Sequence, residues 1–250
     1  MPDFEPTIPA GQPQLMRASS FQRYMEELAR DPRDRVPSTR LSSLGASLTQ
    51  DLMRFEQEGR ATDLIEVLAA GVRHARSITV HLRYGDKVLP LTLFAKERLA
   101  HCPIDPRVLV EQRVDDPLTV LQVEPAVLRP PGDPDRALVG NAATYYPLSP
   151  LLWALAMYGA RAELLPEIAG TAVYRVSPEF DRKLAGRAGP LRSAVMQLRR
   201  EVASLRQIES WPGMNHELAM RLLNAVYLQV GLIISRSHPA ALGDSWFGGM

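Results

Sequence analysis

Residues 77–94 read Ser-Ile-Thr-Val-His-Leu-Arg-Tyr-Gly-Asp-Lys-Val-Leu-Pro-Leu-Thr-Leu-Phe, and this stretch decides the fold class. Apolar Ile78, Val80 and Leu82 alternate with polar residues, which predicts a half-buried strand. The following Tyr-Gly-Asp-Lys has the composition of a tight turn, and residues 88–94 predict the returning strand. Pro90 has no N–H for a strand ladder, so it indicates an edge strand or a bulge.

Working outward from this hairpin, the sequence predicts a small antiparallel sheet with helices before and after it. Residues 98–102 and 119–123 are candidate third and fourth strands. Further helices are predicted over 21–30, 151–158, 162–169 and 190–206, and a further short strand over 173–176. We therefore expect an α+β protein with N-terminal helices, this sheet, and a mostly helical C-terminal region.

The end of the chain has a different pattern. A tight turn at Trp211-Pro212-Gly213 leads into a helix over 215–230, for which Asn215 is the expected cap, and then into a short strand over 232–234. The order of helix, turn, longer helix and strand resembles a winged-helix or helix-turn-helix core. A winged-helix-like end is therefore part of the expected fold.

Proline density sets the expected organisation of the chain. Residues 1–18 contain four prolines, which predicts a flexible arm, and 129–146 begins with the clearest loop, which predicts a linker. We expect helices and sheet over 19–128 and the mostly helical region over 147–250.

The bulk composition excludes several classes of protein. Hydrophobic residues make up 46% and charged residues 23% of the 250 residues, enough for a packed core. The net charge of +1 gives no support to a dedicated nucleic-acid binder or to an electrostatic membrane anchor. No apolar run approaches the roughly 18 residues of a membrane span. Because Cys102 is the single cysteine, no intramolecular disulfide can form, which fits a reducing compartment and leads us to expect a cytoplasmic protein.

No motif for catalysis is present. Nucleophile elbows, P-loops, dinucleotide glycine motifs and zinc-protease helices are all absent, and no two of the five histidines are four residues apart on a helix. No metal or cofactor is therefore expected. His101, Cys102 and Asp105 form the one nucleophile-like cluster. His101 and Cys102 are strand neighbours, so their side chains should point apart, which favours a buried structural cysteine.

Residues 64–102 resemble the PATAN-type module of bacterial signalling adaptors. The matching elements are the helix that begins Leu-Ile-Glu-Val-Leu at 64–68, strands at 78–82 and 89–94, and a closing Glu-Arg-Leu-Ala-His-Cys at 97–102. That family closes with Gly-Arg-Leu-Val-His-Ala, so Glu97 stands where the family has glycine. The resemblance implies a protein-interaction adaptor in signalling or surface motility, and it implies no catalytic residue.

The helix over 215–230 bears on the choice between partners. A helix that reads DNA presents a basic face to the major groove, whereas Arg221 is the one basic side chain within this apolar helix. Such a helix is buried in a core or in a protein interface. We therefore interpret the chain as a non-enzymatic bacterial adaptor or regulator that contacts a protein partner or a second copy. The expected interface residues are Trp211, Leu223, Tyr227, Trp246 and Phe247.

Two alternatives stay open. The first is a winged-helix DNA-binding regulator, which would use Arg199, Arg200, Arg206, Arg221 and Arg236. The second is an enzyme with a non-local site near His101 and Cys102.

Overall fold

The hairpin is the centre of the larger of two sheets. In the computed structural model, β1 (Ser77–Tyr84) pairs antiparallel with β2 (Lys87–Phe94), in unbroken register from Ser77 opposite Phe94 to Tyr84 opposite Lys87. Gly85 adopts a φ of +61° in the connecting turn, a conformation that glycine takes without steric penalty. The structure describes residues 15–30, 47–48, 50, 63–106, 110 and 118–236.

Three more strands complete this sheet, and all of its pairings are antiparallel. They are β3 (Leu99–His101), β4 (Val120–Pro125) and β5 (Tyr145–Pro147). The strand order is β4-β1-β2-β3-β5. The third and fourth strands predicted from the sequence are confirmed, and the α+β class is correct.

Two helices cover the apolar face of the sheet, the face that carries Ile78 and Leu93. They are α4 (Leu64–Arg73) and α6 (Leu148–Tyr158). Gly71 of α4 lies so close to the sheet that a Cβ there would be 2.6 Å from Leu93 Cδ2 and 3.0 Å from Ile78 Cδ1. Glycine is therefore needed at this position to let α4 approach the strands.

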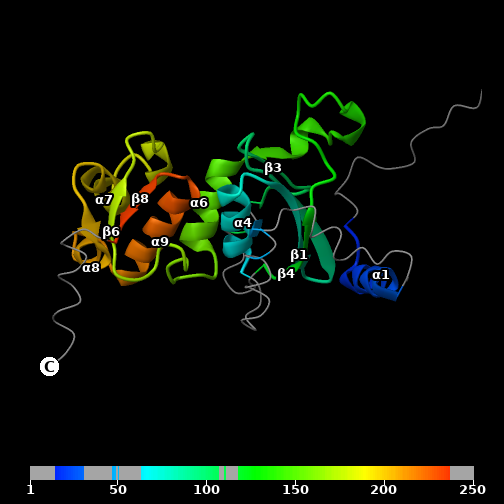
Figure 1. The fold of residues 1–250 in the computed structure, drawn as a ribbon, viewed down its shortest axis with the longest axis horizontal. Coiled ribbons are helices and arrows are strands. Elements are labelled where there is room, and N and C mark those ends of the chain that lie inside the picture. Colours follow the sequence, from blue (N-terminus) through cyan, green and yellow to red (C-terminus); the bar gives the residue numbers. More distant parts are fainter. Residues whose placement is uncertain are drawn as a thin grey trace, which may run out of the picture.

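The opposite face of the sheet is more polar. Thr79 and Thr92 are neighbours on β1 and β2, and their hydroxyl oxygens lie 3.0 Å apart in a buried hydrogen bond. The helix α1 (Ala18–Arg30) lies at one end of this face (Figure 1). The residues expected to form a linker, 129–146, contain η2 (Arg136–Leu138), η3 (Ala142–Thr144) and most of β5.

The C-terminal region carries its own three-stranded antiparallel sheet. Its elements, in chain order, are β6 (Val173–Val176), η4 (Arg182–Ala185), α7 (Pro190–Leu198), β7 (Ala203–Ser204), α8 (Leu205–Glu209), α9 (His216–Leu228) and β8 (Leu232–Ser235). The strand order is β7-β6-β8, so the central strand precedes α7 in the chain. The predicted helix, turn, longer helix and strand are present, while the winged-helix likeness stays a prediction.

The two regions are joined directly. Pro147 ends β5 and Leu148 begins α6, which packs against α9. Arg98, just before β3, donates from Nη2 to Gln229 Oε1 at 2.6 Å and to Ser149 Oγ at 3.0 Å. The two sheets are therefore connected by packing and by hydrogen bonds as well as by the chain.

Two predicted helices differ from the structure. Residues 161–172 form turns and bends rather than a helix over 162–169, because Pro166 lacks an N–H and polar side chains bind the neighbouring backbone. The helix predicted over 190–206 ends at Leu198. Ser204 then caps α8 in a capping box with Gln207, which starts a separate helix.

Pro90 is not on an edge strand, because β2 lies between β1 and β3. However, β3 pairs only with residues 92–94 of β2, so Pro90 has no hydrogen-bonding partner strand on the β3 side. The irregularity in the sheet lies elsewhere, between His81 and Leu82 where β1 pairs with β4. Proline is thus accommodated at position 90 because β3 is too short to pair there, and not because β2 is an edge strand or has a bulge.

Some expectations concern residues outside the described part. Residues 1–14 of the expected arm and the tail that contains Trp246 and Phe247 lie outside the described residues. Among the described helices, none has the length and apolar character that a bilayer crossing requires.

Candidate functional site: a groove between α1 and β4

The segment that begins α1 is bound to the turn of the hairpin. The backbone of Arg17 forms an isolated antiparallel β-bridge with that of Lys87. The Ala18 N–H donates to Asp86 O at 2.7 Å, and the Val88 N–H donates to Met16 O at 2.8 Å. These backbone bonds fix the direction in which α1 leaves the sheet.

Phe21 packs α1 against the polar face of the sheet. Its side chain is buried, and its ring centroid lies 4.9 Å from that of His81 on β1. Tyr24, one turn further along α1, is 46% exposed. Beyond Phe21, the apolar side chains of Tyr24 and Met25 line an open space beside β4.

His81 and Glu124 form a polar pair at the bottom of this space. Glu124 lies opposite Thr79 in the β1–β4 register, and His81 lies opposite Gln122, so the pair is diagonal. His81 Nε2 is 2.9 Å from Glu124 Oε1, and the two side chains are 16% and 20% exposed. The contact is a hydrogen bond with a neutral imidazole and becomes an ion pair when the imidazole is protonated.

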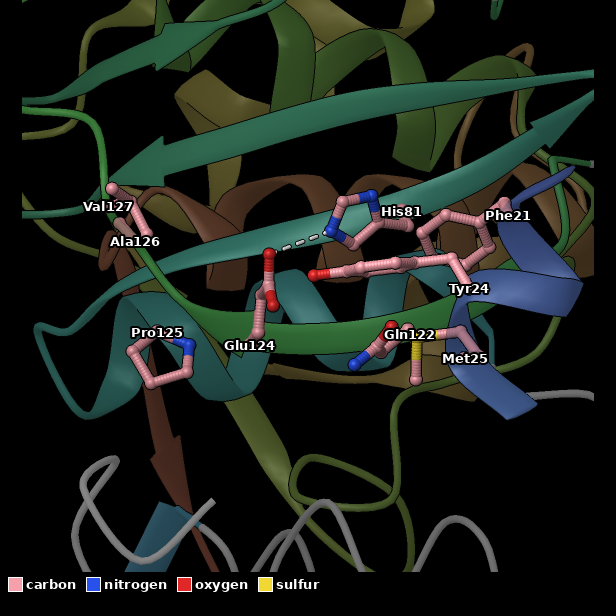
Figure 2. A pocket seen from close by; sticks show the side chains of 9 residues that line it. All are labelled: Phe21, Tyr24, Met25, His81, Gln122, Glu124, Pro125, Ala126 and Val127. Atoms are coloured by element: carbon pink, nitrogen blue, oxygen red, sulfur yellow. Dashed lines mark hydrogen bonds and ion pairs between the residues drawn. The ribbon is translucent and has the colours of Figure 1, made fainter. Parts of the chain in front are cut away.

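Together these residues form a groove of about 450 Å³, which we call the α1–β4 groove (Figure 2). It is lined by Phe21, Tyr24, Met25, His81, Gln122, Glu124, Pro125, Ala126 and Val127. Val127 is 65% exposed on one side and Tyr24 is the exposed aromatic on the other. An apolar rim around a small polar floor is typical of a surface that binds a ligand or a partner side chain.

The groove contains one histidine–carboxylate pair, His81 and Glu124. In covalent catalysis, a histidine–carboxylate pair activates an adjacent nucleophilic side chain. The nine described residues that line the groove include no serine, threonine, cysteine or lysine. Across the described ranges, no three His, Cys, Asp or Glu side chains are grouped so that they could hold a metal ion.

Cys102 lies on the other face of the sheet, within the core. It is fully buried beside Leu82 and Leu89, and burial raises the pKa of its thiol to about 12. The charge of Asp105 acts in the same direction. Such a thiol stays protonated and is a poor nucleophile, so the structure gives no support to Cys102 as a catalytic nucleophile.

His101 points away from Cys102, as the strand geometry predicts. Its ring meets Tyr145 edge-on, with centroids 4.9 Å apart, and a Cβ at Gly140 would lie 2.8 Å from its Nε2. Its Nδ1 atom is buried and has no hydrogen-bond partner among the described residues. Burial lowers the pKa of the His101 imidazole, which favours the neutral form.

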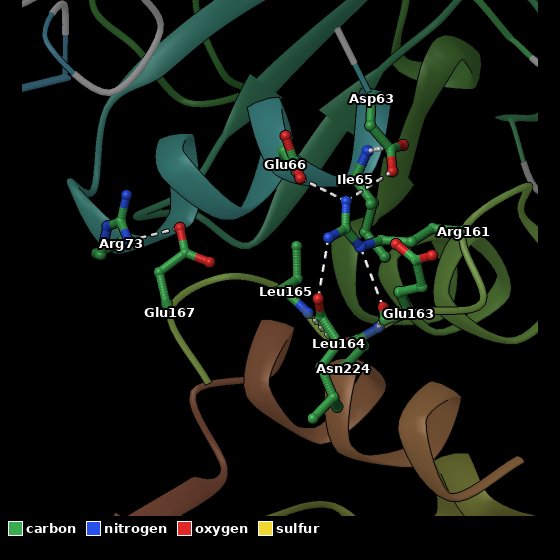
Figure 3. Close-up of polar contacts among 10 residues, drawn as sticks. All are labelled: Asp63, Ile65, Glu66, Arg73, Arg161, Glu163, Leu164, Leu165, Glu167 and Asn224. Carbon is green, nitrogen blue, oxygen red and sulfur yellow. Dashed lines mark hydrogen bonds and ion pairs between the residues drawn. The ribbon is translucent and has the colours of Figure 1, made fainter. Parts of the chain in front are cut away.

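A second polar cluster surrounds Arg161 and connects the two regions (Figure 3). Its Nη1 donates to Asp63 Oδ2 at 3.2 Å and to Glu66, and its Nε and Nη2 donate to the backbone oxygens of Glu163 and Leu164. Each guanidinium nitrogen therefore has a partner within the fold. The cluster is a structural junction between α4 and the segment after α6, and no residue pattern in the sequence indicates it.

Of the predicted interface residues, Trp211, Leu223 and Tyr227 lie in the described part of the chain, and these three do not form one exposed surface. Leu223 is fully buried in α9 and has no surface to offer a partner, because α9 packs against α6. Trp211 and Tyr227 are half-buried and pack against the same core. None of these residues lines the α1–β4 groove. The available signals for the groove were the apolar face of helix 21–30 and the polar residues that alternate along strand 77–83.

The arginines of the DNA-binding alternative have mixed environments. Arg221 donates to Glu217 at 2.8 Å and to the carbonyl oxygens of Ala156 and Gly159, so it is bound within the fold. Arg236 donates to two backbone oxygens after α6. With most of α9 buried and its one arginine engaged, this helix does not present a face for reading a major groove.

Comparison of the chain with protein-family models, with curated proteins and with solved structures finds no match to any of them.

Proposed function

We propose that this protein is a non-enzymatic bacterial adaptor that binds another protein through the α1–β4 groove. The observation that carries the proposal is the pair of exposed apolar side chains, Tyr24 and Val127, on either side of a cavity of about 450 Å³. Exposed apolar groups that border a hollow are characteristic of interaction surfaces. The resemblance of residues 64–102 to PATAN-type adaptor modules leads to the same proposal.

The groove also specifies the chemistry of its occupant. Glu124 is the one acidic residue among the nine described lining residues, and none of the nine is Lys or Arg. We propose a peptide segment of a partner protein that places an aliphatic or aromatic side chain between Tyr24 and Val127. A basic side chain next to it would approach the carboxylate of Glu124.

Site-specific photocrosslinking tests this proposal. A photoreactive phenylalanine analogue replaces Tyr24 in the full chain, and the matched control carries it at Tyr158, which is 57% exposed on α6. In lysate of the native host, position 24 should capture one specific protein that position 158 does not capture. Glu124→Lys should reduce this capture, because it reverses the charge of the groove floor.

Three outcomes would contradict the proposal. They are capture of no protein, equal capture from the two positions, and capture that Glu124→Lys leaves unchanged. A crosslinked product composed only of two copies of this chain would replace the foreign partner with a homodimer, and light scattering of the purified protein would detect that assembly.

A further inference from the structure

Positive charge is concentrated in one segment of the C-terminal region. Residues 175–206 contain eight Lys and Arg residues and three Asp and Glu residues, an excess of five positive charges. The whole chain carries a net charge of only +1, so the remainder is net negative. The overall balance therefore conceals a strongly basic segment, and local concentration of charge is what attracts a charged partner.

The three acidic residues of the segment, Glu179, Asp181 and Glu201, form no salt bridge with its basic side chains in the described part of the chain. Outside the segment, Arg73, Arg161 and Arg221 each form a salt bridge with a carboxylate. None of the eight basic side chains in 175–206 forms a salt bridge with a carboxylate in the described part of the chain. Their positive charge is therefore available to an external anion.

Backbone carbonyls hold three of these arginines in place. Arg199 donates from Nη2 to Pro178 O at 2.7 Å, and Arg192 donates from Nη1 to Arg182 O at 2.6 Å. Arg175 Nη2 lies 3.5 Å from Arg199 O. A carbonyl oxygen accepts the hydrogen bond without neutralising the charge, so these guanidinium groups are ordered and still positive.

These basic residues belong to β6, η4, α7, α8 and the turns that connect them. Both η4 and β6 pack against α7, and the region lies at the end of the molecule opposite α1 (Figure 1). We call this region the basic surface. Its exposed members are Arg175, Arg182, Lys183, Arg187, Arg200 and Arg206.

The scarcity of apolar groups, and of aromatic ones above all, narrows the choice of ligand. Among the described residues, no large hydrophobic side chain within 175–206 is exposed, and the exposed side chain opposite Arg175 on β8, Ile233, is aliphatic. A protein interface has an apolar centre with aromatic anchors, and single-stranded nucleic acid is bound by stacking on aromatic rings. Contact with the phosphates of a duplex needs neither, and such interfaces are polar and strongly positive.

We infer that the basic surface binds double-stranded nucleic acid through its phosphates, without reading sequence. This inference differs from recognition by α9 and does not rest on the proposed function of the α1–β4 groove. It also revises the expectation, drawn from the net charge, that nucleic acid is not a partner.

Fluorescence anisotropy with a short labelled DNA duplex tests the inference on the full chain. We expect the association constant to fall by about three orders of magnitude between about 50 mM and about 200 mM salt. The triple variant Arg182→Gln, Lys183→Gln, Arg187→Gln should weaken binding about tenfold or more, and should reduce the slope against salt by roughly three. The matched control, Arg76→Gln, Arg83→Gln, Arg136→Gln, removes equal charge from exposed positions elsewhere and should bind nearly as well as the native chain.

A second variant, Arg200→Gln with Arg206→Gln, probes the same surface independently, and circular dichroism establishes that each variant is folded. The inference is overturned if no duplex binds at low salt, or if the control weakens binding as much as the triple variant. Tighter binding of a single strand of equal length, or displacement of the duplex by polyglutamate of equal charge, would assign the surface to a different polyanion and would also overturn it.

Discussion

Asn224 of α9 binds the backbone on both sides of Leu164, and its contact with Leu165 is fully buried. The Leu165 N–H donates to Asn224 Oδ1 at 2.9 Å, while Asn224 Nδ2 donates to Glu163 O at 2.8 Å. Asn224 is itself completely buried. A single side chain thus satisfies two backbone groups of a segment that has no regular secondary structure.

Replacing this side chain should be strongly destabilising. Asn224→Ala leaves the buried Leu165 N–H without a partner and leaves Arg161 Nε as the remaining donor to Glu163 O, and we expect a loss of about 1–3 kcal/mol in the free energy of unfolding. Urea unfolding followed by circular dichroism measures it. Asn141→Ala is the control, because Asn141 accepts a similar bond from the Ala143 N–H at 2.9 Å but is exposed, so its loss should be about 1 kcal/mol or less. Equal losses in the two variants would contradict the prediction.

Arg161→Lys should destabilise the protein although it keeps the charge. Lysine has one nitrogen and cannot reproduce the fork that reaches Asp63, Glu66 and two backbone oxygens. We expect a loss of about 1–3 kcal/mol in the free energy of unfolding by urea titration. The same change at exposed Arg23 should alter stability by less than about 0.5 kcal/mol. A neutral result at Arg161 would show that the junction does not depend on guanidinium geometry.

Leu223 should act through the core of the chain. Leu223→Ala should reduce the free energy of unfolding by about 2–5 kcal/mol, because it opens a cavity where α9 is fully buried. Leu223→Asp should prevent folding, since it places an unpaired charge there. Thermal unfolding at several protein concentrations separates a core role from an interface role. If Leu223 served only an interface, Leu223→Ala would destabilise an oligomer and leave the monomer's unfolding unchanged.

Cys102 should resist thiol reagents in the native state. The thiol is fully buried, and its pKa of about 12 leaves it protonated at neutral pH. Labelling with a thiol-reactive chromophore should be slow in buffer and should accelerate in proportion to the unfolded fraction as urea is added. Fast stoichiometric labelling of the native protein would mean that Cys102 is accessible, and would return the enzyme alternative to consideration.

His101 should make stability depend on pH in a defined direction. Its pKa in the folded protein is lowered by burial, so below the unfolded-state value of about 6.5 the unfolded chain binds the proton more readily. The His101 contribution is therefore fully present above about pH 6.5 and is lost as the pH falls towards the folded-state pKa. His101→Gln should lower the free energy of unfolding more at about pH 7.5 than at about pH 5.5.

The neighbouring Tyr145 provides the control for this prediction. Tyr145→Phe removes the hydroxyl that donates to Arg129 O at 2.6 Å and accepts from the Gly140 N–H at 2.9 Å, and it keeps the His101 imidazole in place. Its effect should be the same at the two pH values. A His101→Gln effect that is equally independent of pH would contradict the assigned shift.

Local patterns in the sequence predicted much of the fold. The alternation of Ile78, Val80 and Leu82 identified the central strand, because a period of two is a property of the residues themselves. The cap at Asn215 was also predictable from local sequence, because asparagine is a preferred residue before a helix. The Leu218 N–H donates to its side chain at 2.7 Å.

The features that the sequence did not predict depend on contacts between distant residues. The segment 162–169 has helical composition, but Asn224 of α9 binds its backbone from another element. The α1–β4 groove needs α1 and β4, about a hundred residues apart, to meet on one face of the sheet. The basic surface was hidden by averaging charge over the whole chain, although its residues are close in sequence.

The direct passage from Pro147 of β5 to Leu148 of α6 has a mechanical consequence. With no spacer residue at the junction, and with Arg98 bonded to Gln229 across it, neither region can swing on a hinge at this point. The junction therefore restricts changes in the separation and mutual orientation of the two ends of the molecule. Two molecules bound at the α1 end and at the α7 end would therefore be held in a defined orientation relative to each other.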